Sequence, residues 1–180
     1  MSQIDLHYQD LEKTIIDEFD KLCSEGLYKR GILATTKNNH VTARRMRLIP
    51  DGLTLYAWTD SRSMKIDQIK SNPYVAVVAG FIQVEGKATL CGHPLKQENI
   101  AYIEAYSRKL PESYEKVEKP TFESIKHIEL IKINPVRISL PSMADTFSKD
   151  VLDVEKGKAY RFTGIDWTEA PAYKEEVWIV

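Results

Sequence analysis

The feature that most constrains this chain is a series of short strand-like segments joined by tight turns, between residues 31 and 90. The segments are rich in apolar and β-branched residues, and Asn, Asp, Gly or Pro separates one from the next. One short helix, predicted over 64–70, interrupts the series. Because strands joined by short turns pair in antiparallel fashion, the pattern predicts a mainly β fold, a closed antiparallel β-barrel with flanking helices. The segments are 31–36, 41–49, 53–59, 74–80 and 82–90.

Helical periodicity appears on both sides of this series. Leu11, Ile15 and Phe19 recur on one helix face, which predicts an amphipathic helix from about residue 6 to 27. A second helix is predicted over 97–109. Strands and helices do not alternate regularly, so a doubly wound parallel sheet is disfavoured. The remaining predictions are a loop or frayed helix over 112–120, a helical turn over 122–127, a strand over 128–133 that continues or restarts over 136–140, and edge strands over 158–162 and 177–180.

The chain has 180 residues and no internal repeat or long linker, which predicts a single domain. Its expected parts are an N-terminal helix in 1–28, the barrel with inserted helices in 29–140, and an extension in 141–180. Lys and Arg number 25 against 26 Asp and Glu, which argues against a nucleic-acid-binding protein. No apolar run approaches the ~20 residues that span a bilayer, so no membrane segment is expected. Two cysteines and a polar amino terminus favour the cytoplasm.

The motifs of several common chemistries are missing. The sequence has no GxGxxG or GxxxxGKS/T phosphate loop, no GxSxG nucleophile elbow and no HExxH zinc motif. We therefore predict no metal site. The fragment Cys91-Gly92-His93 has two interpretations, a turn after a strand that Pro94 closes or a metal or redox site.

A cationic and hydroxyl-rich pattern remains in two segments. The first is the run Arg-Arg-Met-Arg at 44–47, and the second is 59–65, which passes from a strand end into a helix start. Free N–H groups at a helix start, hydroxyls and cations together favour a phosphate. Lys65 lies in the first helical turn, where a cation opposes the helix dipole unless an anion compensates it. The other interpretation is solubilising charge, with Ser61 or Ser63 as a helix cap.

At these residues the sequence resembles the flavin-binding split-barrel family typified by pyridoxamine 5′-phosphate oxidase. The resemblance runs from about Gly31 to Leu90 and consists of five fragments in the family's order. They are "GILATT", similar to the first barrel strand; "HVTARRM", similar to an Arg-x-Met strand; "LTLYAWTDSRSMK", similar to a strand ending in an aromatic-Thr pair before a Ser-x-Lys helix start; "SNPYVAVV", similar to an Asn-Pro turn and strand; and "QVEGKATL", similar to a Gln-Val-x-x-Gly-x-Ala strand.

The resemblance implies a six-stranded antiparallel split barrel that acts as a homodimer and holds FMN at the dimer interface. Arg44 or Arg45, together with Lys65, would contact the FMN phosphate, and Ser63 would add a hydroxyl. The register leaves open which of the two arginines is the ligand. The backbone of 45–47 would run beside the isoalloxazine ring. The implied cofactor-binding residues are Arg44, Arg45, Met46, Arg47, Trp58, Thr59, Ser63, Met64, Lys65 and, from the other subunit, Gln83.

The sequence also departs from the enzyme. Met64 stands where the enzyme has an arginine, which leaves Arg62 or Arg47 as replacements for that cation. The enzyme's Tyr-Arg-Ser substrate-phosphate motif and its carboxy-terminal Trp and Arg motif are not matched, so pyridoxamine 5′-phosphate is not the expected substrate. The unplaced residues of those regions are Tyr102, Tyr106, Arg108, Trp167 and Trp178.

The sequence thus predicts an FMN-dependent oxidoreductase with a small-molecule substrate and NAD(P)H as its partners, and it singles out no catalytic side chain. One alternative is a non-catalytic flavin, haem or deazaflavin barrel that acts as a sensor, carrier or store. A haem form needs an axial ligand, for which His93 or His127 are the candidates. A structural dimer with an empty site is the third interpretation.

Overall fold

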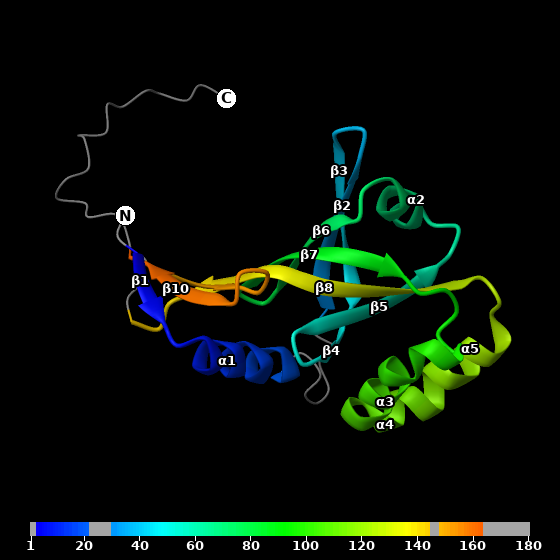
Figure 1. Cartoon of the computed structure of the whole chain (residues 1–180). Coiled ribbons are helices and arrows are strands. Elements are labelled where there is room, and N and C mark those ends of the chain that lie inside the picture. The colour runs from blue at the N-terminus through cyan, green and yellow to red at the C-terminus, as the bar shows by residue number, and fades with distance from the viewer. Residues whose placement is uncertain (1–2, 22–29, 145–147, 164–180) are drawn as a thin grey trace, which may run out of the picture.

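The computed structural model describes residues 3–21, 30–144 and 148–163. Six strands form its antiparallel centre in the spatial order β3-β2-β6-β7-β8-β5, and the second half of β8 continues through β9 and β10 to β1 (Figure 1). The elements are β1 Gln3–Leu6, α1 Tyr8–Asp20, β2 Arg30–Lys37, β3 His40–Arg47, β4 Ile49–Asp51, β5 Thr54–Asp60, α2 Met64–Ser71, β6 Tyr74–Ala79, β7 Ile82–Leu90, η2 Gln97–Asn99, α3 Ile100–Lys109, α4 Pro111–Ser113, η3 Tyr114–Glu118, α5 Lys119–Ser124, β8 Ile128–Pro141, β9 Lys149–Asp153 and β10 Lys158–Phe162.

The mainly β fold with flanking helices is confirmed, but the expected closure of the barrel is wrong. β3 and β5 are the two end strands of the six, and they approach each other without forming a ladder. The reason is local. The short strand β4 follows β3 directly and pairs with the first half of β5, where Ile49 lies opposite Tyr56 and Asp51 opposite Thr54. The second half of β5, from Ala57 to Asp60, keeps its β8 partner on one edge and has an open edge toward β3.

Several predicted elements differ in extent. The predicted segments 128–133 and 136–140 form one continuous strand, β8, whose pairing with β7 shifts register at Glu85/Gly86 and places Gly86 opposite Pro135. Such a bulge accommodates a proline, which has no N–H for the ladder. The segment predicted as loop or frayed helix over 112–120 is helical. β1 and β9 were not predicted, and the strand predicted over 177–180 lies outside the described residues.

Two apolar clusters hold these elements together. The first fills the inside of the barrel with residues such as Leu33, Val77 and Ile131, and the buried face of α1 joins it. The second is aromatic and lies between β5 and the helical segment α3–α5, with Tyr102 and Phe122 at its centre. The open edge between β3 and β5 lies beside this second cluster, so the helical segment stands next to the opening (Figure 1). No helix of the described residues is long and apolar enough to cross a membrane.

Candidate functional site

A polar cluster forms where β3 passes helix α2, and Arg44 is its most strongly held member. One guanidinium nitrogen, Nη1, donates to Thr35 Oγ1 at 2.6 Å and to the carbonyl oxygen of Leu33 at 3.1 Å. The other, Nη2, donates to Thr42 Oγ1 and to Gln68 Oε1, the latter at 3.2 Å. Partial burial lowers the pKa of Arg44. These bonds fix the guanidinium against α2.

Lys65 lies in the same cluster. Its Nζ donates to Thr59 Oγ1 at 2.8 Å, and the Thr59 and Ser63 hydroxyls are 3.5 Å apart. Burial lowers the pKa of Lys65, the positive charge of Arg44 lowers it further, and Asp60 acts in the opposite direction. Ser63 precedes α2, yet its side chain makes no capping hydrogen bond. The cluster therefore presents two cations and two hydroxyls on one short stretch of surface.

The neighbouring candidates lie elsewhere. Arg45 is exposed on the opposite face of β3 from Arg44, because successive strand residues alternate. Of the two arginines, Arg44 is the one beside Lys65. Met64 is 59% exposed, and Arg62 forms a two-nitrogen ion pair with Asp60 that holds the pKa of this carboxyl well below its usual range. Arg62 is thus engaged outside the cluster.

A cleft of about 330 Å³ occupies the opening between β3 and β5. Thr59 belongs both to the cleft and to the Arg44–Lys65 cluster, so the two are continuous. Trp58 forms part of the wall and packs edge-on against Phe122 of α5, with ring centroids 5.5 Å apart. The lining residues are Arg45, Met46, Arg47, Trp58, Thr59, Asp60 and Glu118.

Glu118 is the residue of this cleft that the sequence did not reveal. Arg47 donates through Nη1 to Glu118 Oε1 and, at 2.6 Å, to the hydroxyl of Tyr106. The Tyr106 hydroxyl in turn donates to Glu118 Oε1 at 2.8 Å, and burial raises the pKa of Tyr106 to about 12. This network ties β3 to the helical segment across the opening. Arg47 is committed to it and does not join the Arg44–Lys65 cluster.

Two buried polar atoms of the described residues have no hydrogen-bond partner, and both belong to this region. They are Glu118 Oε2 and the hydroxyl of Tyr102. Glu118 is 2% exposed and Tyr102 is fully buried. Burial raises the pKa of Tyr102 well above its ordinary value, and the neighbouring Tyr106 and Glu118 add to the effect. Unpaired buried polar groups are uncommon, so their coincidence beside one cleft calls for an explanation.

Gln83 lies apart from the cleft. It is exposed on the outer face of β7, opposite Val78 of β6, and Val78 in turn lies opposite Ile32 of β2. Ile32 and Val78 are 42% and 39% exposed, so this face of the sheet presents apolar side chains to the outside. A groove of about 430 Å³, lined by Tyr74 among others, runs over the same face.

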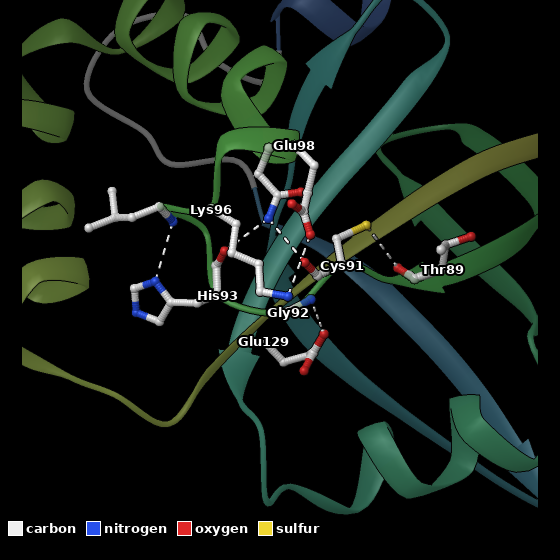
Figure 2. Close-up of polar contacts among 9 residues, drawn as sticks. Thr89, Cys91, Gly92, His93, Lys96, Glu98 and Glu129 are labelled. Carbon is white, nitrogen blue, oxygen red and sulfur yellow. Dashed lines mark hydrogen bonds and ion pairs between the residues drawn. The ribbon is translucent and has the colours of Figure 1, made fainter.

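The fragment Cys91-Gly92-His93 follows β7 as irregular backbone that is still hydrogen-bonded to Leu130, and it leads into a turn at 94–95 (Figure 2). Gly92 has a φ of 72° and donates its N–H to Glu129 Oε1 at 2.5 Å. His93 Nε2 lies 3.1 Å from the carbonyl oxygen of Ile125, and His93 Nδ1 accepts from the N–H of Leu95 at 3.3 Å. Among the described residues no group of three His, Cys, Asp or Glu side chains is arranged to hold a metal ion.

Comparison with known proteins points in one direction. No family model matches the sequence. General stress protein 26 of Bacillus subtilis strain 168 is 29% identical over 94 residues, which are 47% of this chain and 63% of that protein, so the match spans less than two thirds of its length. A Listeria innocua protein, provisionally described as a pyridoxamine 5′-phosphate oxidase, is 25% identical with a TM-score of 0.52, and the superposition covers 71% of this chain and 95% of that one.

Two more distant structures share the fold. A pyridoxamine 5′-phosphate oxidase-related, FMN-binding protein of Nostoc punctiforme has a TM-score of 0.55 and 16% identity, over 82% of this chain and 92% of that one. HutZ, the haem storage protein of Vibrio cholerae, has a TM-score of 0.51 and 11% identity, over 68% and 89%. The split-barrel fold that the sequence resemblance implied is thereby confirmed.

Two tyrosines test the network in the cleft wall as a matched pair, because both are fully buried and one turn apart on α3. Tyr106→Phe is expected to lower the free energy of unfolding by about 1–3 kcal/mol, since it takes a hydroxyl from Arg47 and Glu118. Tyr102→Phe removes a hydroxyl without a partner and is expected to leave stability unchanged or to raise it. Urea denaturation of both variants measures this, and equal losses would contradict it.

Proposed function

We propose that this chain, whose structural neighbours are pyridoxamine 5′-phosphate oxidase-like FMN-binding proteins and relatives of General stress protein 26, binds FMN and is a flavin-dependent oxidoreductase acting on a small molecule. One observation carries the proposal. The cations of Arg44 and Lys65 and the hydroxyls of Thr59 and Ser63 form one cluster that opens, at Thr59, into the cleft between β3 and β5.

The donor set fits a phosphate. A phosphate monoester carries close to two negative charges at neutral pH and accepts several hydrogen bonds. Arg44 and Lys65 supply the charges, and among the described residues neither is paired with a carboxylate. Thr59 and Ser63 supply hydroxyls, and the first turn of α2 supplies unpaired N–H groups.

The cleft suits the isoalloxazine ring of FMN, which the ribityl chain joins to the phosphate. Trp58 offers an aromatic surface, and the backbone of 45–47 forms the facing wall. Bound FMN would supply the two-electron redox chemistry that amino-acid side chains lack. The chain's own part is to hold the phosphate, fix the ring between β3 and β5 and leave room for a substrate.

We further propose that the protein is a homodimer formed through the outer face of β2, β6 and β7. This face exposes Ile32 and Val78, and the groove beside Tyr74 adds apolar surface. Contiguous exposed apolar surface of this kind is typical of subunit interfaces. Gln83 lies on the same face, where a second subunit would bring it toward the partner's FMN site.

A haem-storing or non-catalytic flavin or deazaflavin barrel is the second candidate, favoured by the shared fold with HutZ. The histidines argue against haem. Both ring nitrogens of His93 are engaged with the backbone, and His127 is exposed at the start of β8. An absorption spectrum of the freshly purified protein decides among the candidates. A flavin spectrum that bleaches with NADH or NADPH supports the oxidoreductase, a flavin spectrum that does not bleach supports a binding role, and a Soret band supports haem.

The phosphate cluster predicts a loss of cofactor in a double variant. Arg44→Ala with Lys65→Ala is expected to remove most FMN binding, because charge-assisted hydrogen bonds contribute roughly 1.5–3 kcal/mol each. FMN fluorescence titration measures the Kd. The matched control is Arg62→Ala with Lys70→Ala, which removes the same number of positive charges from α2 and the turn before it, outside the cluster. Full flavin occupancy in the first double variant would refute the assignment.

The lowered pKa of Lys65 predicts that FMN binding weakens at alkaline pH. A bound phosphate favours the protonated amine, so binding takes up a proton once free Lys65 begins to lose it. Because burial and the charge of Arg44 lower the pKa of the free Lys65 amine below its ordinary value of 10.5, the fall in affinity begins below that pH. Lys65→Arg is the control, since a guanidinium stays charged throughout this range. A wild-type Kd that is constant up to pH 10.5 would contradict the prediction.

The proposed interface predicts that Val78→Asp gives a monomer. A charge at the centre of an apolar interface is unfavourable because it is desolvated there without a partner. Light scattering after size-exclusion chromatography measures the mass. Val117→Asp, an equally drastic change at an exposed position of η3, is expected to leave the dimer intact. A wild-type monomer that binds FMN at full affinity would remove the argument for an interface site.

A further inference from the structure

Only one oxygen of the buried Glu118 carboxylate has hydrogen-bond partners among the described residues. Its Oε1 accepts from Arg47 and from Tyr106, whereas Oε2 has no partner among the described residues. A carboxylate oxygen shut off from water normally has a donor, because losing its hydration without replacement costs more than an ordinary hydrogen bond contributes. Oε2 therefore lacks one donor that the described part of the chain does not supply.

The local backbone places Glu118 at the cleft. It is the last residue of η3, a single π-helical turn between α4 and α5. Such turns are rare and occur frequently at functional sites. Glu118 lines the cleft together with Arg47 and Trp58, although Oε2 itself is covered. A rotation of the carboxylate is what brings Oε2 to a molecule in the cleft.

The distance along β3 matches a ligand anchored by its phosphate. Arg47, the partner of Glu118, lies three residues beyond Arg44 on the same strand, which is about 10 Å at the rise of an extended chain, and it lies on the other face of β3. Thr59 joins the Arg44–Lys65 cluster to the cleft that Arg47 lines, so a ligand reaches both by crossing the open edge of β3 at Thr59. A molecule whose phosphate lies at Arg44 and Lys65 and whose body follows the cleft therefore extends toward Glu118. In FMN, the ribityl chain separates the phosphate from the ring in this way.

The charge environment selects the kind of donor. The negative charge of Glu118 is already offset by Arg47, so a second cation would be repelled by the guanidinium. A neutral N–H group satisfies Oε2 without that repulsion. The oxidised isoalloxazine ring has one such group, its imide N–H.

We propose that Glu118 Oε2 accepts a hydrogen bond from the imide N–H of the flavin ring, which makes the helical segment α3–α5 a specificity element for the cofactor. This inference rests on the proposed function, because it requires FMN in the cleft. It goes beyond it by assigning ring recognition to a residue outside the barrel.

The internal alternative is that Tyr102 is the missing donor. The hydroxyl of Tyr102 is also unpaired, and Tyr102 packs with Tyr106 in the aromatic cluster. The charge of Glu118 contributes to raising the pKa of Tyr102. The two atoms are not hydrogen-bonded to each other. Tyr102→Phe separates the two explanations, because it removes the internal donor and leaves Glu118 and the cleft in place.

The test compares FMN with 3-methyl-FMN, in which a methyl group replaces the imide hydrogen. Fluorescence titration gives both Kd values for the wild type, Glu118→Gln and Tyr102→Phe. Glu115→Gln is the matched control, an exposed glutamate on the same η3 turn. We expect the wild type to bind FMN about tenfold or more tightly than 3-methyl-FMN, as for a hydrogen bond to a charged group. In Glu118→Gln the two Kd values are expected to become similar. In Tyr102→Phe and Glu115→Gln the preference for FMN over 3-methyl-FMN is expected to remain.

The outcomes separate the inference from the proposed function. Wild-type protein that binds FMN and 3-methyl-FMN equally overturns the imide contact while FMN binding stands. A preference for FMN that persists in Glu118→Gln, or that Tyr102→Phe abolishes, also overturns it. Wild-type protein that binds neither flavin overturns the proposed function and the inference together. Thermal unfolding of Glu118→Gln, which keeps an oxygen for Arg47 and Tyr106, shows whether the variant is folded when its Kd is measured.

Discussion

The structure depends on one edge of β5. β8 pairs along the length of this strand on one side, but on the other side β4 pairs only with its first half. If β3 paired with the second half instead, the six strands would close into a barrel and fill the space that is now the cleft. The tight path from β3 through Leu48 into β4 prevents this, because β4 already occupies the adjoining edge. A three-residue strand thus keeps the barrel open and creates a site from backbone that would otherwise be paired.

The opening has two chemically different ends. At the end near α2, Arg44 and Lys65 lie close together without a carboxylate between them, and each has a pKa lowered by burial. At the other end, Arg47 is neutralised by Glu118 and fixed by Tyr106. One end therefore has two cations that are not ion-paired with a carboxylate of the described residues, and the other has a closed ion pair, so the two ends of the cleft differ in charge. An elongated ligand with one anionic end and one neutral polar end matches this difference.

The sequence predicted what is encoded locally. The strands of the barrel and helix α2 have strong short-range patterns, and the segment with Thr59, Ser63 and Lys65 is nearly contiguous, so this half of the cluster was found. The choice between Arg44 and Arg45 was open because neighbouring strand residues face opposite sides, and only the packing of α2 on the sheet shows which side faces Lys65.

What could not be predicted depends on contacts between distant segments. Glu118 lies 71 residues beyond Arg47 in a charged stretch, where a glutamate normally belongs to a solvated surface. β1 and β9 are short and exist through their pairing with β10 and β8, which no local pattern records. Whether the second half of β8 continued across Asn134-Pro135 depended on a bulge at Val136, where its pairing with β7 shifts register. In each case the deciding contact joins residues that are far apart in the sequence, so a short stretch of sequence does not reveal it.

The two ends of the cleft also differ in what they do for the fold. The Arg47–Glu118 pair links β3 to the helical segment across the opening, which is a structural contribution whether or not a ligand is bound. Burial disfavours the charged forms of Arg44 and Lys65, and the charge of Arg44 adds to this effect on Lys65. An anion bound there offsets this effect, and a ligand that binds only the folded chain stabilises it in proportion to RT ln(1 + [L]/Kd). If the proposed FMN binds at Arg44 and Lys65, its phosphate would couple cofactor binding to the stability of the folded chain.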